Sequence, residues 1–169
     1  ATAMLWCALV ILCGARYAWG WLTLWRARRD WGHARCCGEA VLVSNDVGPA
    51  LVGVLRARVV VPAWLLRSDA ARQRMALLHE REHARARDHW LLAFAPLLTI
   101  VFPWNLALWW QLRRLRLAIE LDCDRRVLAH GVQPRAYGTM LLEIAQGTHL
   151  VRAAALAEPR SLLSHRIAA

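Results

Sequence analysis

Two histidines and a glutamate in the stretch LLHEREHARARD, residues 77–88, have the spacing of a metal site. Residues i and i+4 of a helix project from one face, so His79 and His83 can offer their imidazoles to the same ion. Glu80 is expected to reach a water on that ion and act as its general base. The spacing therefore predicts a hydrolytic zinc site. The competing interpretation is a solvated helix in which Glu82 pairs with neighbouring arginines.

A catalytic zinc ion needs a third protein ligand and one open coordination position. The downstream candidates are acidic or histidine side chains, namely Asp88, His89, Glu120, Asp122, Asp124 and His130. His89 is expected on a different face of the helix that carries His83, and Asp122 is expected to point away. Glu120 and Asp124 are again i and i+4, so one could bind the metal while the other orients a ligand histidine.

The five cysteines provide no further metal motif, because none of them forms a CxxC pair. The adjacent Cys36 and Cys37 lack the usual spacing of zinc ligands, and a metal role is not expected for them. In a cytoplasmic setting the thiols are expected to be free.

The composition indicates a membrane protein. Hydrophobic residues make up 58% of the 169 residues and the formal net charge is +10. A basic soluble protein would suggest nucleic acid as partner. A basic chain this apolar instead indicates arginines at the cytoplasmic membrane surface, so lipid is an expected partner and direct nucleic-acid binding is not.

Residues 1–26 are predicted to form a transmembrane helix, because an apolar run broken only by Arg16 is long enough to span a bilayer. RARR at 26–29 follows at once, which the positive-inside rule assigns to the cytoplasmic side. A signal peptide would carry its charges before the apolar run. We therefore expect a bacterial-type inner (plasma) membrane location with the active site on the cytoplasmic side.

The rest of the chain is predicted to be mainly α with a small antiparallel β unit. Residues 27–63 are expected to be a polar connector and a sheet of two or three strands. The segment SNDVGP contains residues that are typical of a turn between strands. Residues 64–169 are expected to form a helical domain that carries the zinc site, which the resemblance given below identifies as a zinc metallopeptidase domain. Ser68 or Asp69 should cap its first long helix, and Gly131 and Pro134 should separate two later ones.

A second apolar run, at about residues 90–112, must turn back on itself if one ion is to join the two motifs. A straight membrane-spanning helix would place Glu120 about 30 Å from the histidines. Pro103 supplies a break. We therefore predict a helical hairpin that dips into the membrane or packs against other membrane helices, with arginines at both of its ends.

These motifs together resemble the BlaR/MecR family of membrane zinc peptidases, the antibiotic sensor-transducers and their relatives. Members carry HExxH, a basic-Asp continuation, an apolar segment with a Pro-aromatic centre, and Glu-x-x-Cys-Asp or Glu-x-x-Ala-Asp. HEREHARARDHW and FPWNLALWWQLRRLRLAIELDCDRRVLAHG carry the resemblance, which covers about residues 41–148. It implies a membrane-embedded, gluzincin-like metallopeptidase domain with a Zn²⁺ cofactor.

The resemblance also implies individual roles. The zinc ligands would be His79, His83 and Glu120, the catalytic base Glu80, the carboxylate that orients a ligand Asp124, and a structural carboxylate Asp88. EPRSLLSHRI near the end is similar to a segment of the related Ste24/HtpX-type peptidases. Arg166, His165 or Tyr137 could accordingly stabilise an oxyanion, with surface or helix packing as the competing interpretation for each.

The implied partner is a protein or peptide substrate, expected to be a transcriptional repressor or the enzyme itself, cleaved during signal transduction. No SxxK with a matching KTG is present, so the resemblance does not extend to beta-lactam sensing. The alternative function is a catalytically silent, zinc-binding membrane signalling or scaffold protein, against which the intact Glu80 argues.

Overall fold

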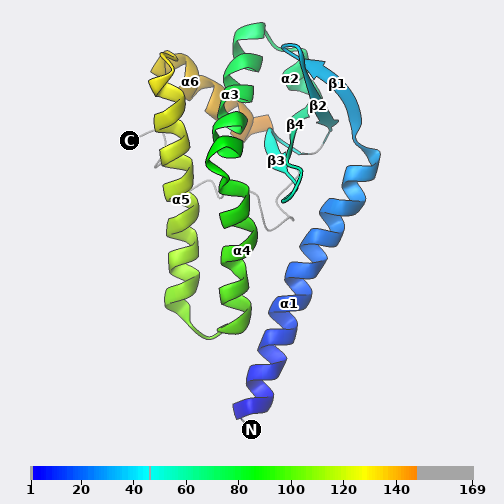
Figure 1. Ribbon diagram of the computed structural model, residues 1–169, viewed down its shortest axis with the longest axis vertical. Helices are drawn as coiled ribbons and strands as arrows, with labels where there is room; N and C mark the ends of the chain where they lie inside the picture. The colour runs from blue at the N-terminus through cyan, green and yellow to red at the C-terminus, as the bar shows by residue number, and fades with distance from the viewer. Residues whose placement is uncertain (1, 46, 148–169) are drawn as a thin grey trace.

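The computed structural model describes residues 2–45 and 47–147 (Figure 1). It begins with a long helix, α1 (Thr2–Ala27), in which no residue is buried. A 3-10 turn, η1 (Arg28–Asp30), leads from this helix into the sheet. Within the described residues, the helical stretch Thr2–Asp30 is the one that is long and apolar enough to cross a membrane.

A four-stranded mixed sheet follows, with the strand order β1-β2-β4-β3. Its strands are β1 (Gly32–Cys36), β2 (Glu39–Ser44), β3 (Ala50–Val52) and β4 (Arg58–Pro62). The chain is therefore mainly α with a small β unit, as predicted, but the purely antiparallel arrangement was wrong. Strands β1–β2 and β3–β4 are antiparallel pairs, whereas β2 and β4 run parallel, with Leu42 opposite Val60.

The first long helix of the helical part is α3 (Ala70–Ala86), which comes after the short α2 (Ala63–Leu66). Asp69 caps α3 by accepting a hydrogen bond from the backbone N–H of Arg72, as predicted. The helix ends at Arg87, whose φ of 60° is left-handed, and α4 (Asp88–Val101) begins at once in a new direction. The expectation that His89 continues the helix of His83 was therefore wrong.

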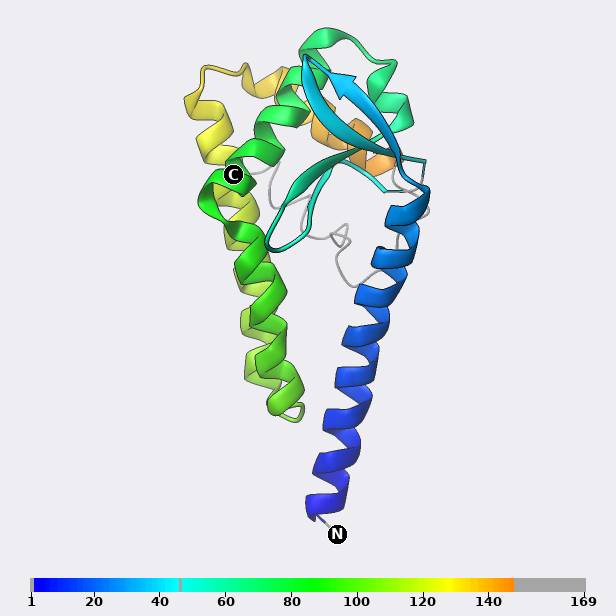
Figure 2. The same ribbon diagram turned by 45° about the vertical axis from the view of Figure 1, so that its right-hand side comes forward.

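Helices α4 and α5 (Leu106–Ala129) form the predicted hairpin. They lie side by side in both views, joined by a short turn that contains Pro103 (Figures 1 and 2). Asn105 caps α5 through the backbone N–H of Leu108. After α5, Gly131 takes a φ of 80° and α6 (Pro134–Gly147) starts at its proline, as predicted.

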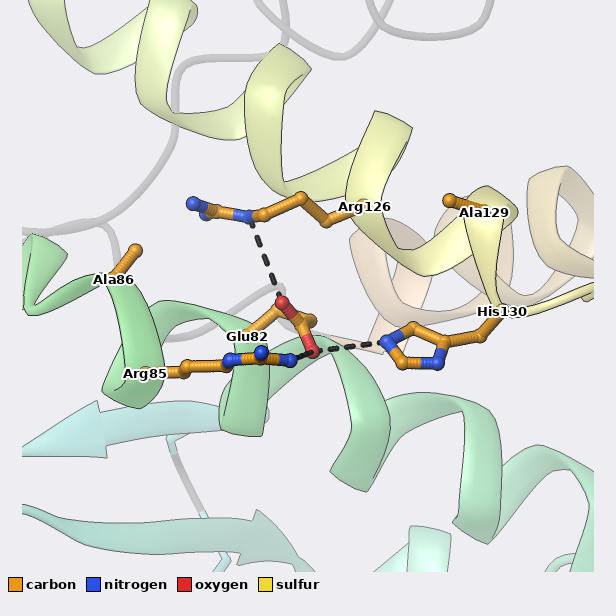
Figure 3. A pocket seen from close by; sticks show the side chains of 6 residues that line it. All are labelled: Glu82, Arg85, Ala86, Arg126, Ala129 and His130. Atoms are coloured by element: carbon orange, nitrogen blue, oxygen red, sulfur yellow. Dashed lines mark hydrogen bonds and ion pairs between the residues drawn. The ribbon is translucent and has the colours of Figure 1, made fainter.

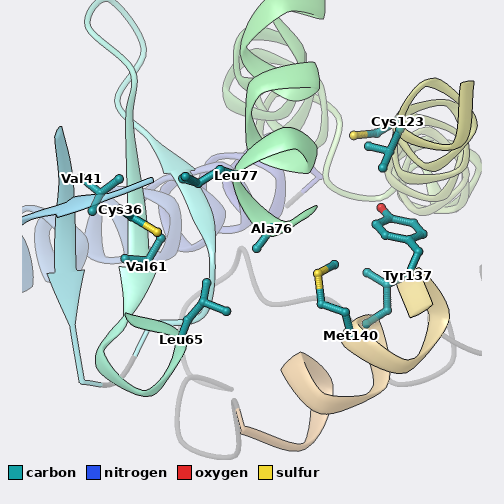
Figure 4. Close-up of a cluster of buried hydrophobic side chains, with 11 residues drawn as sticks. Cys36, Val41, Val61, Leu65, Ala76, Leu77, Cys123, Tyr137 and Met140 are labelled. Carbon is teal, nitrogen blue, oxygen red and sulfur yellow. The ribbon is translucent and has the colours of Figure 1, made fainter. Parts of the chain in front are cut away.

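The main core lies where α3 packs between the sheet, α5 and α6 (Figure 4). Apolar side chains from each of these elements and from α2 meet there, and the largest fully buried ones include Leu65 of α2, Met140, Val61 and Val127. This packing fixes α3 against α5, and it is these two helices that carry HExxH and ELDCD.

Candidate metal centre

Helix α3 presents His79 and His83 on one buried face, and each residue is only 8% exposed. Their Nε2 atoms lie 3.2 Å apart. Two nitrogens that bind one tetrahedral zinc at the usual bond length are about 3.3–3.4 Å apart. The two imidazoles are therefore already spaced as ligands of a single ion.

Helix α5 brings Glu120 to the same point, because the hairpin returns it to the level of α3. One carboxylate oxygen of Glu120 lies 3.6 Å from Nε2 of His79, and the other lies 3.7 Å from Nε2 of His83. These separations are close to the distance expected between two ligand atoms of one tetrahedral zinc ion. Three donors from two helices thus converge around one position.

Asp88 fixes the ring of His83 from the other side. Its Oδ2 lies 2.8 Å from Nδ1 of His83, and Asp88 is buried at the first residue of α4. A carboxylate accepts, so the proton of the neutral ring sits on Nδ1 and the lone pair of Nε2 points inward. The sharp turn at Arg87 is what places Asp88 there.

Tyr137 and Asp124 fix the ring orientation of His79, as Asp88 does for His83. The Tyr137 hydroxyl donates to Oδ1 of Asp124 at 2.7 Å, and its oxygen lies 2.8 Å from Nδ1 of His79. Since that hydroxyl proton is committed to Asp124, the ring nitrogen is the donor in the second contact. Both Nε2 lone pairs then face each other, an arrangement that a cation between them would stabilise. The donor set fits a zinc ion.

The site is also strongly anionic. Burial lowers the pKa of His79, but hydrogen bonds to Cys123 and Glu120 outweigh burial and raise that pKa to about 10. The same balance raises the pKa of His83 to about 12. The negative groups around the two imidazoles therefore favour positive charge at this point, which a metal ion between the two neutral rings would supply.

Glu80 sits beside the ligand pair on α3 and is 4% exposed. Its negative charge is one of the influences that raise the pKa of both His79 and His83. A buried carboxylate next to a cation site can act as the general base for a water held there.

Cys123 is the site residue that our sequence reasoning missed. Its Sγ lies 3.3 Å from Nδ1 of His79, and with His79 and His83 it forms a fully buried group whose donor atoms lie within 4.8 Å of one another. Burial raises the pKa of its thiol, but the two imidazoles outweigh burial and lower it overall. The available signal was its position three residues after Glu120, on the same face of a helix.

The other candidate ligands lie away from this point. Asp122 is exposed and pairs with Arg126, while His130 pairs with Glu82 at 3.1 Å (Figure 3). Glu82 also pairs with Arg126 and Arg85, so the arginine–glutamate contacts expected of a charged helix exist alongside the histidine cluster.

Cys36 ends β1 and Cys37 lies in the β1–β2 turn, and both thiols contact Gln73. His165 and Arg166 fall outside the described residues.

Two comparisons with known proteins identify relatives of this chain. Residues 4–169 match the family described as BlaR1 peptidase M56. The regulatory protein BlaR1 of Bacillus licheniformis is 30% identical over 80 residues, which are 47% of this chain and 13% of that protein. The chain thus spans a small part of the length of this relative.

Proposed function

Because the chain belongs to the BlaR1 peptidase M56 family, we propose that it is an integral membrane zinc endopeptidase with a cytoplasm-facing active site. The observation that carries the proposal is the convergence of His79, His83 and Glu120 from two helices, with Nε2 atoms 3.2 Å apart. Each ligand imidazole is oriented by a separate carboxylate or phenol, as metal-binding histidines usually are.

In this proposal three side chains hold the cofactor and a fourth moves the proton. Zinc held by His79, His83 and Glu120 would act as a Lewis acid toward the peptide carbonyl and lower the pKa of the attacking water. Glu80 takes the proton of that water and delivers it to the nitrogen of the leaving amine. Asp88 and Tyr137 keep the ligand rings in place during these steps.

The substrate is proposed to be an extended segment of a regulatory protein, such as a repressor, or of the enzyme itself. Strand β3 is an edge of the sheet and packs beside α3, which carries the ligands. An edge strand offers unpaired N–H and C=O groups to an incoming chain, which can add to the sheet as a further strand. Backbone pairing of this kind binds a peptide without requiring one particular sequence.

Membrane insertion is proposed for α1 and for the α4–α5 hairpin. Large apolar side chains on these helices face outward, among them Met4, Ile11, Leu98 and Leu106. The arginine-rich ends of α1 and of the hairpin lie toward the same end of the molecule as the sheet and the ligands (Figure 2). By the positive-inside rule that end faces the cytoplasm.

The test is Glu80→Gln in the full chain purified in detergent, with zinc content and self-cleavage or peptide cleavage as readouts. The variant should keep about one zinc per chain and lose cleavage by at least a hundredfold, because it lacks the base but retains the ligands. Cleavage at the wild-type rate by this variant would remove the catalytic assignment. His79→Ala is the matched control, and it should lose the metal as well.

A silent zinc-binding signalling protein remains the second candidate, because Cys123 is buried beside His79. Its thiolate could occupy the coordination position that a substrate carbonyl needs. Zinc retention without any cleavage by the wild-type chain, together with cleavage after Cys123→Ala, would favour that function.

A further inference from the structure

Arg126 does no chemistry in the proposed reaction, yet it lies one contact away from a ligand. We propose that Arg126 is a positioning residue that sets the metal affinity of the site by holding Asp88 against His83. This inference rests on the proposed zinc site and adds a residue that the sequence pattern does not predict.

The two contacts meet on one atom. Oδ2 of Asp88 accepts from Nδ1 of His83 at 2.8 Å and from Nη2 of Arg126 at 3.1 Å. If the Asp88 carboxylate rotated toward one of these two donors, its oxygen would lose the hydrogen bond to the other. The guanidinium therefore limits the rotation of the Asp88 carboxylate and, through it, the direction of the His83 ring.

Arg126 is itself held from two further sides. Its Nη1 lies 3.0 Å from Asp122. Among the described residues its buried Nε has no hydrogen-bond partner and forms only a longer ion pair, at 3.7 Å, with Glu82. Glu82 is on α3, Asp88 begins α4 and Asp122 is on α5. One guanidinium thus ties together the three helices whose relative placement defines the metal centre.

The planar fork of arginine is what suits it to this position. Its donors spread in fixed directions and can serve three carboxylates at once, whereas a lysine ammonium is a compact charge on a flexible stem. Within the described part of the chain, Arg126 is the only arginine that forms an ion pair with Asp88.

The surroundings allow the residue to be changed without overpacking. A hollow of about 470 Å³ is bordered by Glu82, Arg126 and His130, so a shorter side chain meets open space (Figure 3). Glutamine at position 126 should therefore fit, and its effect on the metal should come from the lost contacts.

The experiment is a double-mutant cycle on zinc affinity, measured by competition with a chelating dye on the full chain in detergent. Asp88→Asn alone should weaken zinc binding by about 10–100-fold, and Arg126→Gln alone by about tenfold. If Arg126 acts through Asp88, adding Arg126→Gln to Asp88→Asn should cost less than about twofold more, because contacting residues in one network are not additive. Arg125→Gln, the exposed neighbour, should leave affinity unchanged.

Full additivity in the cycle, or wild-type zinc affinity in Arg126→Gln, would overturn the inference while leaving the proposed function intact. A wild-type chain that binds no zinc would remove both. Should Arg126→Gln fail to fold by circular dichroism, Arg126→Lys replaces it in the cycle. Lysine keeps a positive charge among the carboxylates but cannot hold all three, so its zinc affinity should still fall, and an unchanged value would again overturn the inference.

Discussion

At the scale of residues, the two ring nitrogens of His79 and of His83 have separate tasks in the proposed site. In both imidazoles Nδ1 contacts an oxygen of the protein, and Nε2 faces the other ring and Glu120. The i, i+4 spacing predicted which rings would meet, because helical geometry is local. It could not predict Cys123 or the contact between Tyr137 and His79, because these depend on how α5 and α6 pack onto α3.

Tyr137 gives a prediction that separates two roles. Its hydroxyl touches His79 and Asp124 and the residue is 3% exposed, which favours a task of orienting His79 over contact with substrate. Tyr137→Phe should weaken zinc binding by about tenfold. A residue of the oxyanion hole would instead lower kcat about a hundredfold or more at full zinc occupancy. Chelator competition and steady-state kinetics on the same preparation distinguish the two roles, and unchanged zinc affinity would contradict ours.

At the scale of elements, the sequence predicted the α4–α5 hairpin in full but the sheet only in part. Pro103 and the requirement that one ion join two motifs determined the turn between α4 and α5. Strand β1 reads GHARC, in which apolar and polar residues are too mixed to separate it from a connector. The parallel pairing of β2 with β4 arises because β3 takes the edge position beyond β4, a non-local choice that strand composition does not encode.

The proposed binding of a peptide substrate at the edge strand β3 can be tested by changing the turn that follows this strand. Gly53 has a φ of +108°, and a Cβ there would lie 2.7 Å from the backbone oxygen of Arg56. Gly53→Ala should therefore distort the β3–β4 turn and raise KM for a peptide substrate severalfold, while zinc affinity stays unchanged. Gly38→Ala is the matched control, because Gly38 also has a positive φ but open space around its Cβ position. Equal KM values for the two variants would count against substrate binding at this edge.

At the scale of the whole molecule, α1 and the hairpin form one apolar unit beneath the sheet (Figures 1 and 2). The Tyr17 hydroxyl donates to the carbonyl of Ala93, and the Trp6 indole donates to that of Val101, so α1 and α4 run in opposite directions side by side. With 14 residues α4 is about 21 Å long, short of the roughly 30 Å of a hydrocarbon core. The apolar runs were predictable from composition. The contact between α1 and α4 was not, because the sequence of each segment predicts a helix but not the neighbour against which it packs.

The proposed membrane orientation predicts that the β1–β2 turn is accessible to reagents from the cytoplasmic side only. Cys37 is exposed in that turn. In a chain with Cys7 and Cys13 changed to serine, a membrane-impermeant maleimide should label Cys37 in inverted vesicles but not in intact cells. A Cys37→Ser, Asn105→Cys chain, with its thiol at the hairpin tip, is the control and should resist labelling in inverted vesicles. Labelling of Cys37 from outside intact cells would reverse the orientation.

The central claim is that Glu120, together with His79 and His83, holds one zinc ion. Zinc K-edge X-ray absorption of the loaded chain measures it most directly, because sulfur ligands lie at about 2.3 Å and nitrogen or oxygen ligands at about 2.0–2.2 Å. We predict a shell of nitrogen and oxygen alone, which Cys123→Ser leaves unchanged and Glu120→Gln disrupts. A sulfur shell in the wild-type chain that disappears in Cys123→Ser would contradict the account.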